Sequence, residues 1–274
     1  MHVEGIYTYQ DLRERGYTPH GIANALAAGD IKRVAHGWYA EDFANQKVVR
    51  ALELGGKLGC LSACKLYGIW TPPHSELHVV FTSADGIPAG AAFTGVCAHV
   101  RSRSFTKEPL WPLLDCLDHV IRYHDVETVL IVLESAIHKE LITTDDAVVL
   151  LADHPKKAAR VLKHLDIAES GTETRVRLFL RQRRVKLRPQ VWVTSKCRVD
   201  LLLGESLVIE CDSEEFHSSQ ESYEKDRRRD SHLRILGYDV WRLSYKQVWE
   251  IWEETKLDLQ HVYRKRKQRT RIES

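Results

Sequence analysis

The sequence predicts a mixed α/β protein of the α+β type, with helices and strands in three successive regions. Residues 8–40 give two short helices and a β-hairpin, residues 47–150 mix helical and strand segments, and residues 170–245 follow the order helix, hairpins, helix, strand. The chain has 274 residues, 43% hydrophobic and 28% charged, which is typical of a globular protein with two or three domains.

The first region contains a clear signal for the start of a helix. Thr18 stands as an N-cap before Pro19, which is the residue order that helix N-termini prefer. A short helix precedes this cap, and the strand-like stretch "HGWYA" follows the second helix. This order predicts a winged helix-turn-helix over residues 1–45, with residues 19–28 as the recognition helix; a small helical cap without a ligand is the alternative. The residues placed for DNA contact are Thr18, His20, Arg33 and His36.

The middle region, residues 46–150, is expected to form a separate α/β domain. Glycines break its first helices, "ELHVVF" and "GVCAHVRS" are strand-like, and two apolar helices follow. Its histidines lack the spacing of a metal site, so we expect them to be surface or core residues. They are His74, His78, His99, His119, His124 and His138. Residues 151–168 are expected to form a linking helix, and residues 169–274 a C-terminal domain.

The six cysteines, at positions 60, 64, 97, 116, 197 and 211, include no CxxC pair. Cys60 and Cys64 lie four residues apart without a second pair at zinc-binding spacing, which favours buried free thiols. The first residues, "MHVEGIYTYQ", lack the features of a secretory signal, and no apolar run reaches the roughly 18 residues of a membrane helix. These features predict a cytoplasmic protein without a membrane partner.

Positive charge is concentrated in the C-terminal part of the chain. Residues 1–160 carry 16 Lys and Arg against 19 Asp and Glu, a net charge of −3, whereas residues 161–274 carry 24 against 19, a net charge of +5. The tail "RKRKQRTR" adds to this excess and is expected either to be solvated or to bind phosphates. Its candidate DNA contacts are Arg264, Lys265, Arg266 and Lys267. This distribution favours an anionic partner for the C-terminal part.

Acidic residues interrupt an otherwise apolar hairpin, "VDLLLGESLVIECD", at residues 199–212. Apolar residues take alternate positions on both strands, so the acids fall together on the other face. If the turn is centred on Glu205, Asp200 lies opposite Glu210, with Cβ atoms about 4.5–5.5 Å apart. Like charges at that distance are destabilising unless one is protonated or a cation lies between them. The alternating apolar residues are Val199, Leu201, Leu203, Leu207, Ile209 and Cys211.

A divalent cation, magnesium or manganese, would remove this repulsion, since such ions prefer oxygen ligands. The candidate metal ligands are Asp200, Glu210 and Asp212. A solvent-exposed polar sheet face is the alternative, but the preceding segments favour a site. A strand pair centred on Ser195 places Gln190 beside Asp200, and a helix capped by Ser170 carries Glu173 in its first turn.

The segment after the hairpin adds further acids. A helix closed by Gly237 carries Asp226 and Asp230 on the same side as the apolar Leu233. Acids in that position are costly unless they are paired, and Arg229 and Arg242 are the candidate partners. Acidic side chains are therefore expected to converge from two helices and a hairpin.

Residues 170–245 resemble the small endonuclease domain of very-short-patch mismatch repair, within the PD-(D/E)XK nuclease superfamily. The resemblance rests on Glu173, on Asp200, and on the strings "IECDSEEFH", "YEKDRRRD" and "LGYDVWRL". It implies a restriction-endonuclease-like core with a magnesium-dependent site that cleaves DNA phosphodiesters.

The resemblance also implies roles for individual residues. Asp200 matches the motif aspartate and Glu210 the next acidic ligand. Asp212 stands where the superfamily usually has lysine; the repair-endonuclease branch shares this departure and uses a histidine, which makes His217 the candidate general acid or base. The full candidate catalytic set is Glu173, Asp200, Glu210, Asp212, His217, Asp226 and Arg229.

Residues 8–150 more loosely resemble the AbiEi-type antitoxin of abortive-infection systems, through the winged helix, "LSACKLYGIW" and "LESAIHKELIT". This resemblance implies DNA binding by the winged helix. Two functions follow: a metal-dependent DNA endonuclease in phage defence or DNA repair, or a DNA-binding regulator of antitoxin type that keeps the nuclease fold as a scaffold. Cutting both strands would need a homodimer or two successive events.

Overall fold

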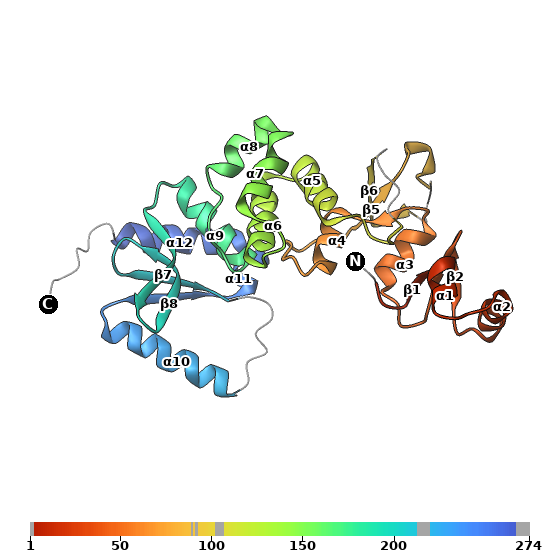
Figure 1. Cartoon of the computed structure of the whole chain (residues 1–274). Coiled ribbons are helices and arrows are strands. Elements are labelled where there is room, and N and C mark those ends of the chain that lie inside the picture. The colour runs from red at the N-terminus through yellow and green to blue at the C-terminus, as the bar shows by residue number, and fades with distance from the viewer. Residues whose placement is uncertain (1–2, 89, 91–92, 102–106, 213–219, 267–274) are drawn as a thin grey trace. The chain divides into compact units, whose positions relative to one another are not determined.

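The computed structural model describes residues 3–88, 90, 93–101, 107–212 and 220–266, and it describes the backbone alone for residues 220–227 and 265–266. The chain divides into two compact units (Figure 1). The first unit comprises residues 1–69 and 74–124, and the second comprises residues 70–73 and 125–274. Among the described residues, no helix combines the length and the apolar character needed to cross a membrane.

The first unit begins with the predicted pair of helices and a hairpin. Thr18 caps the second helix by accepting a hydrogen bond from the Gly21 N–H at 2.9 Å, and Gly29 ends it at φ +83°. The strands form an antiparallel sheet in the order β1-β3-β2. These elements are β1 (Ile6–Thr8), α1 (Tyr9–Glu14), α2 (Pro19–Ala28), β2 (Lys32–Ala35) and β3 (Trp38–Ala40). The predicted helices and hairpin are confirmed, while DNA binding by them stays a prediction.

The rest of the first unit is a second sheet, in the order β4-β5-β6, with its helices. Strands β5 and β6 are parallel, and β4 is antiparallel to β5. Gly59 lies between β4 and α4. A Cβ atom at this position would overlap the Val80 side chain, so the close approach requires glycine. The elements are α3 (Gln46–Glu53), β4 (Lys57–Leu58), α4 (Cys60–Leu66), β5 (Leu77–Phe81), the 3-10 helix η1 (Ala84–Gly86), β6 (Val96–Val100) and α5 (Leu113–Tyr123).

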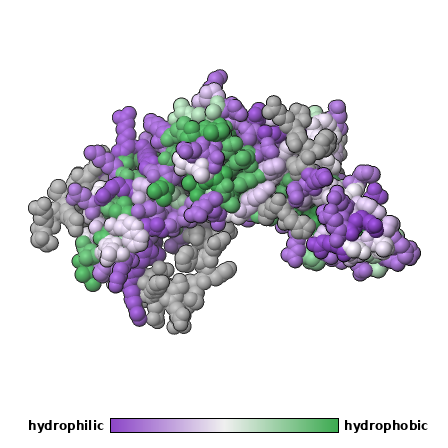
Figure 2. All heavy atoms as spheres, viewed as in Figure 1, coloured by the Kyte–Doolittle hydropathy of each residue, from purple (hydrophilic) through white to green (hydrophobic). Residues whose placement is uncertain are grey.

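Apart from residues 70–73, the second unit starts with four helices, of which α6 lies in the region that the sequence assigned to the middle domain. Within this unit a buried ion pair joins two helices: the Arg177 guanidinium of α9 bonds both carboxylate oxygens of Glu134 of α6. The helices of this part are α6 (Val126–His138), α7 (Thr144–Ala152), α8 (Pro155–Leu162) and α9 (Gly171–Gln182). Hydrophobic residues gather on the surface over α6–α8 (Figure 2), where Val149 is 71% exposed.

The second unit continues as a four-stranded sheet in the order β10-β9-β8-β7. Strands β7, β8 and β9 are antiparallel neighbours, and β10 runs parallel to β9. The sequence predicted this order of helix, hairpins, helix and strand. The elements are β7 (Leu187–Thr194), β8 (Cys197–Leu203), β9 (Leu207–Cys211), α10 (Gln220–Ile235), β10 (Asp239–Leu243), α11 (Tyr245–Trp249) and α12 (Trp252–Arg266).

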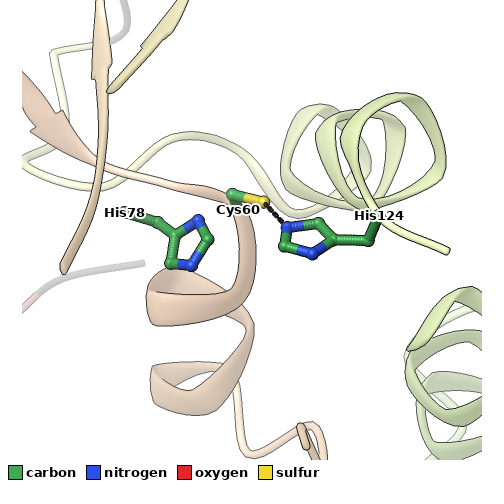
Figure 3. A group of neighbouring side chains, drawn as sticks. All are labelled: Cys60, His78 and His124. Carbon is green, nitrogen blue, oxygen red and sulfur yellow. Dashed lines mark hydrogen bonds between the residues drawn. The ribbon is translucent and has the colours of Figure 1, made fainter. Parts of the chain in front are cut away.

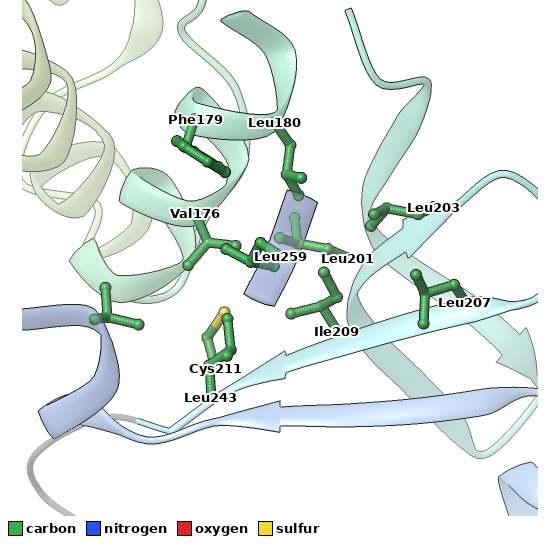
Figure 4. Packing of buried hydrophobic residues seen from close by; sticks show 11 residues of the cluster. Val176, Phe179, Leu180, Leu201, Leu203, Leu207, Ile209, Cys211, Leu243 and Leu259 are labelled. Atoms are coloured by element: carbon green, nitrogen blue, oxygen red, sulfur yellow. The ribbon is translucent and has the colours of Figure 1, made fainter. Parts of the chain in front are cut away.

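Apolar clusters cover both faces of this sheet. On one face, Leu201 and Ile209 pack against Val176 of α9 and Leu259 of α12 (Figure 4). On the other face, Leu233 of α10 packs against Leu202, Val208 and Val199. The solvent-exposed polar face considered from the sequence is therefore not present in this sheet.

The sequence predicted that Val199, Leu201 and Leu203 of β8 all face the same side of the sheet, and this was wrong for Val199. Leu201 and Leu203 belong to the cluster with α9, whereas Val199 belongs to the cluster with Leu233 of α10. The residue opposite Asp200 on β7 is Gln190, whose φ of +50° interrupts regular strand geometry between two paired positions. The alternation of side chains fails where the strand pairing is irregular.

Candidate functional site

Three acidic side chains meet at one end of the four-stranded sheet. Glu173 comes from the first turn of α9, Asp200 from β8 and Glu210 from β9. Glu173 and Glu210 are each 4% exposed, and Asp200 is half-buried. β8 and β9 pair with Leu201 opposite Ile209, which is the register predicted from the turn at Glu205, and the neighbouring Asp200 and Glu210 side chains interact with each other.

The start of α9 fixes the position of Glu173. The Ser170 hydroxyl accepts a hydrogen bond from the Glu173 N–H at 3.2 Å and donates to the Glu173 carboxylate at 3.0 Å. Gly171 lies so close to the Trp70 ring that a Cβ there would overlap it. The helix start is thus held by a cap and by a close approach that only glycine permits.

Gln190 links two of the acids. Its side-chain nitrogen donates to the Glu173 carboxylate at 2.6 Å and lies 3.5 Å from Asp200 Oδ1. A residue other than glycine at φ +50° is strained, and such strain concentrates at functional positions. Sequence reasoning placed Gln190 beside Asp200 but gave it no role, because the bond to Glu173 depends on how α9 packs on the sheet.

Arg229 of α10 bonds one of the hairpin acids. Its guanidinium donates to Glu210 Oε1 at 2.9 Å and also to the backbone carbonyl of Arg198. Asp200 accepts a hydrogen bond from the Cys211 N–H at 2.8 Å. Arg229 therefore partly offsets the burial of Glu210, and Asp200 is held by the backbone of the neighbouring strand.

Arg242 pairs with one of the α10 acids, as the sequence predicted. The Arg242 guanidinium bonds Asp230, with a shortest distance of 2.8 Å between Arg242 Nη2 and Asp230 Oδ1. Arg242 Nη1 lies 3.6 Å from Asp212 Oδ1, and the Asp212 side chain is 44% exposed. Asp212 thus lies at the more exposed edge of the site, beside a guanidinium.

Burial raises the pKa of all three acids. The pKa of Glu210 rises to about 8 because the carboxyl is buried and faces Asp200, and the opposing effect of Arg229 is smaller. The pKa of Glu173 rises to about 7, again through burial first and Asp200 second. Burial also raises the pKa of Asp200. A cation bound beside these carboxyl groups would favour their ionised forms and so oppose the effect of burial.

The donor set fits a divalent cation in its chemistry. Carboxylate oxygens are the ligands that magnesium and manganese prefer, and a cation beside Asp200 and Glu210 would favour their ionised forms. In the described part of the chain, however, the side-chain groups whose ligand atoms already lie within 4.8 Å of one another belong to the first unit.

Other predicted residues lie elsewhere or outside the described part. His217 and Lys267 are not among the described residues, and neither are the side chains of Asp226, Lys265 and Arg266. Arg264 is exposed near the end of α12. In the first unit, the candidate DNA contacts Thr18, His20, Arg33 and His36 are all exposed.

Comparisons with known proteins point to one class of enzyme. Residues 173–262 match the model of the restriction-endonuclease-like family REase_MTES_1575, and this span contains Glu173, Asp200 and Glu210. The C-terminal part of the chain is a nuclease-like domain. Its mixed α/β architecture, with a mainly antiparallel sheet covered on both faces, agrees with the predicted restriction-endonuclease-like core.

One solved structure is also similar to this part of the chain. The catalytic domain of the homing endonuclease I-Bth0305I is 26% identical, covers 34% of this chain and 92% of its own length, and has a TM-score of 0.30. The comparison with curated proteins finds no match. The family match leaves residues 1–172 outside it, so the winged helix and the likeness to AbiEi stay predictions.

Proposed function

We propose that this protein is a divalent-metal-dependent endonuclease that nicks or cuts DNA. The observation that carries the proposal is the convergence of Glu173, Asp200 and Glu210, from three separate elements, inside a nuclease-like domain. Three carboxyl groups with raised pKa values are too many for Arg229 alone to neutralise. A bound cation and the phosphate of a nucleic acid would complete the charge balance of the site.

Asp200 and Glu210 are the residues that would hold the cation, magnesium or manganese. When bound, such an ion polarises a phosphoryl oxygen and lowers the pKa of a water molecule. Arg229 lies against Glu210 and would orient this carboxylate, or turn toward a phosphate that enters the site. Asp212, whose side chain is 44% exposed beside Arg242, is a third candidate ligand.

Glu173 is the described residue best suited to move a proton. Its pKa of about 7 lies close to neutral pH, where a general base is most effective. Gln190 and Ser170 both donate hydrogen bonds to its carboxylate and so fix the direction of its free lone pairs. We assign the activation of the attacking water to Glu173, with His217 as a second candidate from the sequence.

DNA is the substrate that we propose, with the first unit holding the duplex. The exposed Arg33 and His36 lie together on the β2–β3 hairpin, with 3.3 Å between Arg33 Nη2 and His36 Nδ1. They follow α2, which has the cap and length predicted for a recognition helix. Phage defence or DNA repair is the biological setting that we propose, and a homodimer would account for cutting of both strands.

A plasmid-nicking assay tests this function. Purified protein is incubated with supercoiled DNA in Mg²⁺, in Mn²⁺ and in chelator, beside the variants Asp200→Asn and Glu205→Gln. Glu205 is an exposed acid in the turn of the same hairpin and serves as the control. We expect nicking only with metal, full activity in Glu205→Gln, and a loss of at least about 100-fold in Asp200→Asn, since a metal contributes several kcal/mol.

One observation supports the alternative of a non-enzymatic DNA-binding regulator. The ion pair between Arg229 and Glu210 satisfies a buried acid without any metal. Under this alternative, the protein binds duplex DNA, the plasmid stays supercoiled in every metal, and Asp200→Asn binds DNA as well as the parent does. That result would overturn the nuclease proposal.

A further inference from the structure

The first unit contains a second group of side chains with metal-binding chemistry. Cys60 at the start of α4, His78 on β5 and His124 at the end of α5 place one ligand atom each within 4.8 Å of one another (Figure 3). The Cys60 sulfur lies 3.2 Å from His124 Nε2. His78 lies 18 positions after Cys60, and His124 lies 46 positions after His78. These separations match no metal-binding motif, so the sequence alone did not indicate the group.

A second group shares His78 and surrounds it with further donors. Cys97 and His99 lie two residues apart on β6. This strand pairs with β5 so that His78 lies opposite Cys97. His78 Nδ1 lies 3.0 Å from His99 Nε2, and the Cys97 sulfur lies 3.7 Å from the same His99 nitrogen. The ligand atoms of these three residues also lie within 4.8 Å of one another. Four other residues with nitrogen or sulfur ligand atoms therefore gather around the buried His78 imidazole.

Most of the side chains in this cluster are buried, although histidine is a polar residue. Cys60, His78 and His99 are at most 3% exposed, while Cys97 and His124 are half-buried. Burial lowers the pKa of His78 to about 3 and that of His99 to about 4, so both imidazoles are neutral, which is the form that binds metals. Cys60 has φ +48°, a strained conformation that turns its backbone at the first position of α4.

We propose that Cys60, His78 and His124 bind a zinc ion. Zinc–sulfur bonds of about 2.3 Å and zinc–nitrogen bonds of about 2.0–2.1 Å in a tetrahedron place ligand atoms about 3.3–3.6 Å apart. The 3.2 Å between the Cys60 sulfur and His124 Nε2 is close to this spacing. Thiolate and imidazole select zinc over magnesium, so this site differs in chemistry from the carboxylates of the nuclease-like domain.

Binding would exchange a proton for the metal. The S–H bond of Cys60 breaks, its proton leaves to the solvent, and the sulfur forms a bond to zinc, while both imidazoles bind through nitrogens that carry no proton. The ion would join α4, β5 and the end of α5, elements that are far apart in the sequence of the first unit. Zinc should therefore stabilise this unit in proportion to its free concentration.

Metal analysis of the full chain tests the proposal. Protein stripped with chelator is incubated with ZnCl₂ or CoCl₂, freed of excess metal, and examined by elemental mass spectrometry, visible spectroscopy and thermal melting. We expect about one tightly held Zn²⁺, a thiolate-to-cobalt charge-transfer band, and a higher melting temperature with zinc. A parent protein that retains no zinc and shows no such band would overturn the proposal.

Matched variants locate the ion. Cys60→Ala and His124→Ala should both lose the metal, whereas Cys64→Ala should keep it. Cys64 is as buried as Cys60 and lies one turn along the same helix. If Cys60→Ala does not fold, the half-buried His124 decides the question. Zinc retained in His124→Ala at the parent level contradicts the site, and Asp200→Asn should leave the zinc content unchanged, which separates this proposal from the nuclease proposal.

Discussion

The side-chain amide of Gln190 donates a hydrogen bond to the Glu173 carboxylate at 2.6 Å, joining β7 to the first turn of α9. Glu173 receives further hydrogen bonds from the Ser170 hydroxyl and the Glu169 N–H. All three donors favour the ionised form of a carboxyl group whose burial favours the protonated form. The balance between these effects sets the proton affinity of the site.

Gln190→Leu should therefore move the pH dependence of nicking. Loss of the amide donor raises the pKa of Glu173 further, because a buried carboxylate without that hydrogen bond is less stable by about 1–3 kcal/mol. If Glu173 acts as the base, the acidic limb of the pH–rate profile should shift to higher pH. Gln182→Leu, the same change at an exposed position of α9, is the control. Identical profiles for parent and Gln190→Leu would show that Glu173 does not titrate in the reaction.

Glu210→Gln should change how stability depends on pH without metal. The pKa of Glu210 in the folded protein, about 8, exceeds the ordinary value of 4.5, so the folded state binds the proton more tightly than the unfolded state. The free energy of unfolding should therefore fall as pH rises from about 5 to 8, by up to about 1.4 kcal/mol per pH unit for one proton. Urea unfolding of Glu210→Gln should show a shallower decline, and Glu205→Gln should match the parent.

Arg177→Met should destabilise the second unit. The Arg177 and Glu134 side chains are each 1% exposed, and Thr174 donates to the same Glu134 carboxylate at 2.6 Å. Removing one partner of a buried ion pair costs about 3–5 kcal/mol, because the other charge stays buried without compensation. The double variant Glu134→Gln, Arg177→Met should recover part of this loss in urea unfolding. Equal destabilisation by the single and double variants would contradict an uncompensated Glu134 charge as the cause.

The double variant Arg33→Ala, His36→Ala should weaken duplex binding and its dependence on salt. Each phosphate contact contributes about 0.9 to the slope of log affinity against log salt concentration, so loss of Arg33 alone should lower the slope by about that amount. Fluorescence anisotropy over a range of salt concentrations measures it. Arg50→Ala, an exposed arginine paired with Glu53 on α3, is the control. An unchanged slope would show that the β2–β3 hairpin does not contact phosphates.

Local rules were sufficient for much of the fold and part of the site. Thr18 and Pro19 indicated the start of α2, Ser170 indicated the start of α9, and the turn around Glu205 predicted the register that places Leu201 opposite Ile209. Caps, turns and strand pairing act within a few residues, so the order of amino acids specifies them directly.

Caps, turns and strand pairing do not predict which side chains from distant elements come into contact. The sequence offered Arg229 and Arg242 as partners for the acids of α10, and packing paired Arg229 instead with Glu210 of the hairpin. The ion pair between Arg177 on α9 and Glu134 on α6 was likewise not indicated by any local pattern. Each of these contacts depends on which helix face meets which neighbour.

The sequence by itself determined the elements, the register of the acidic hairpin and the chemistry of its carboxylates. Only the tertiary structure decided that Gln190 reaches Glu173, and that Cys60, His78 and His124 meet although no spacing motif connects them. The physical reason is the range of the forces involved. Backbone hydrogen bonds and caps are satisfied locally, whereas side chains from separate elements meet only after apolar faces have packed together and excluded water.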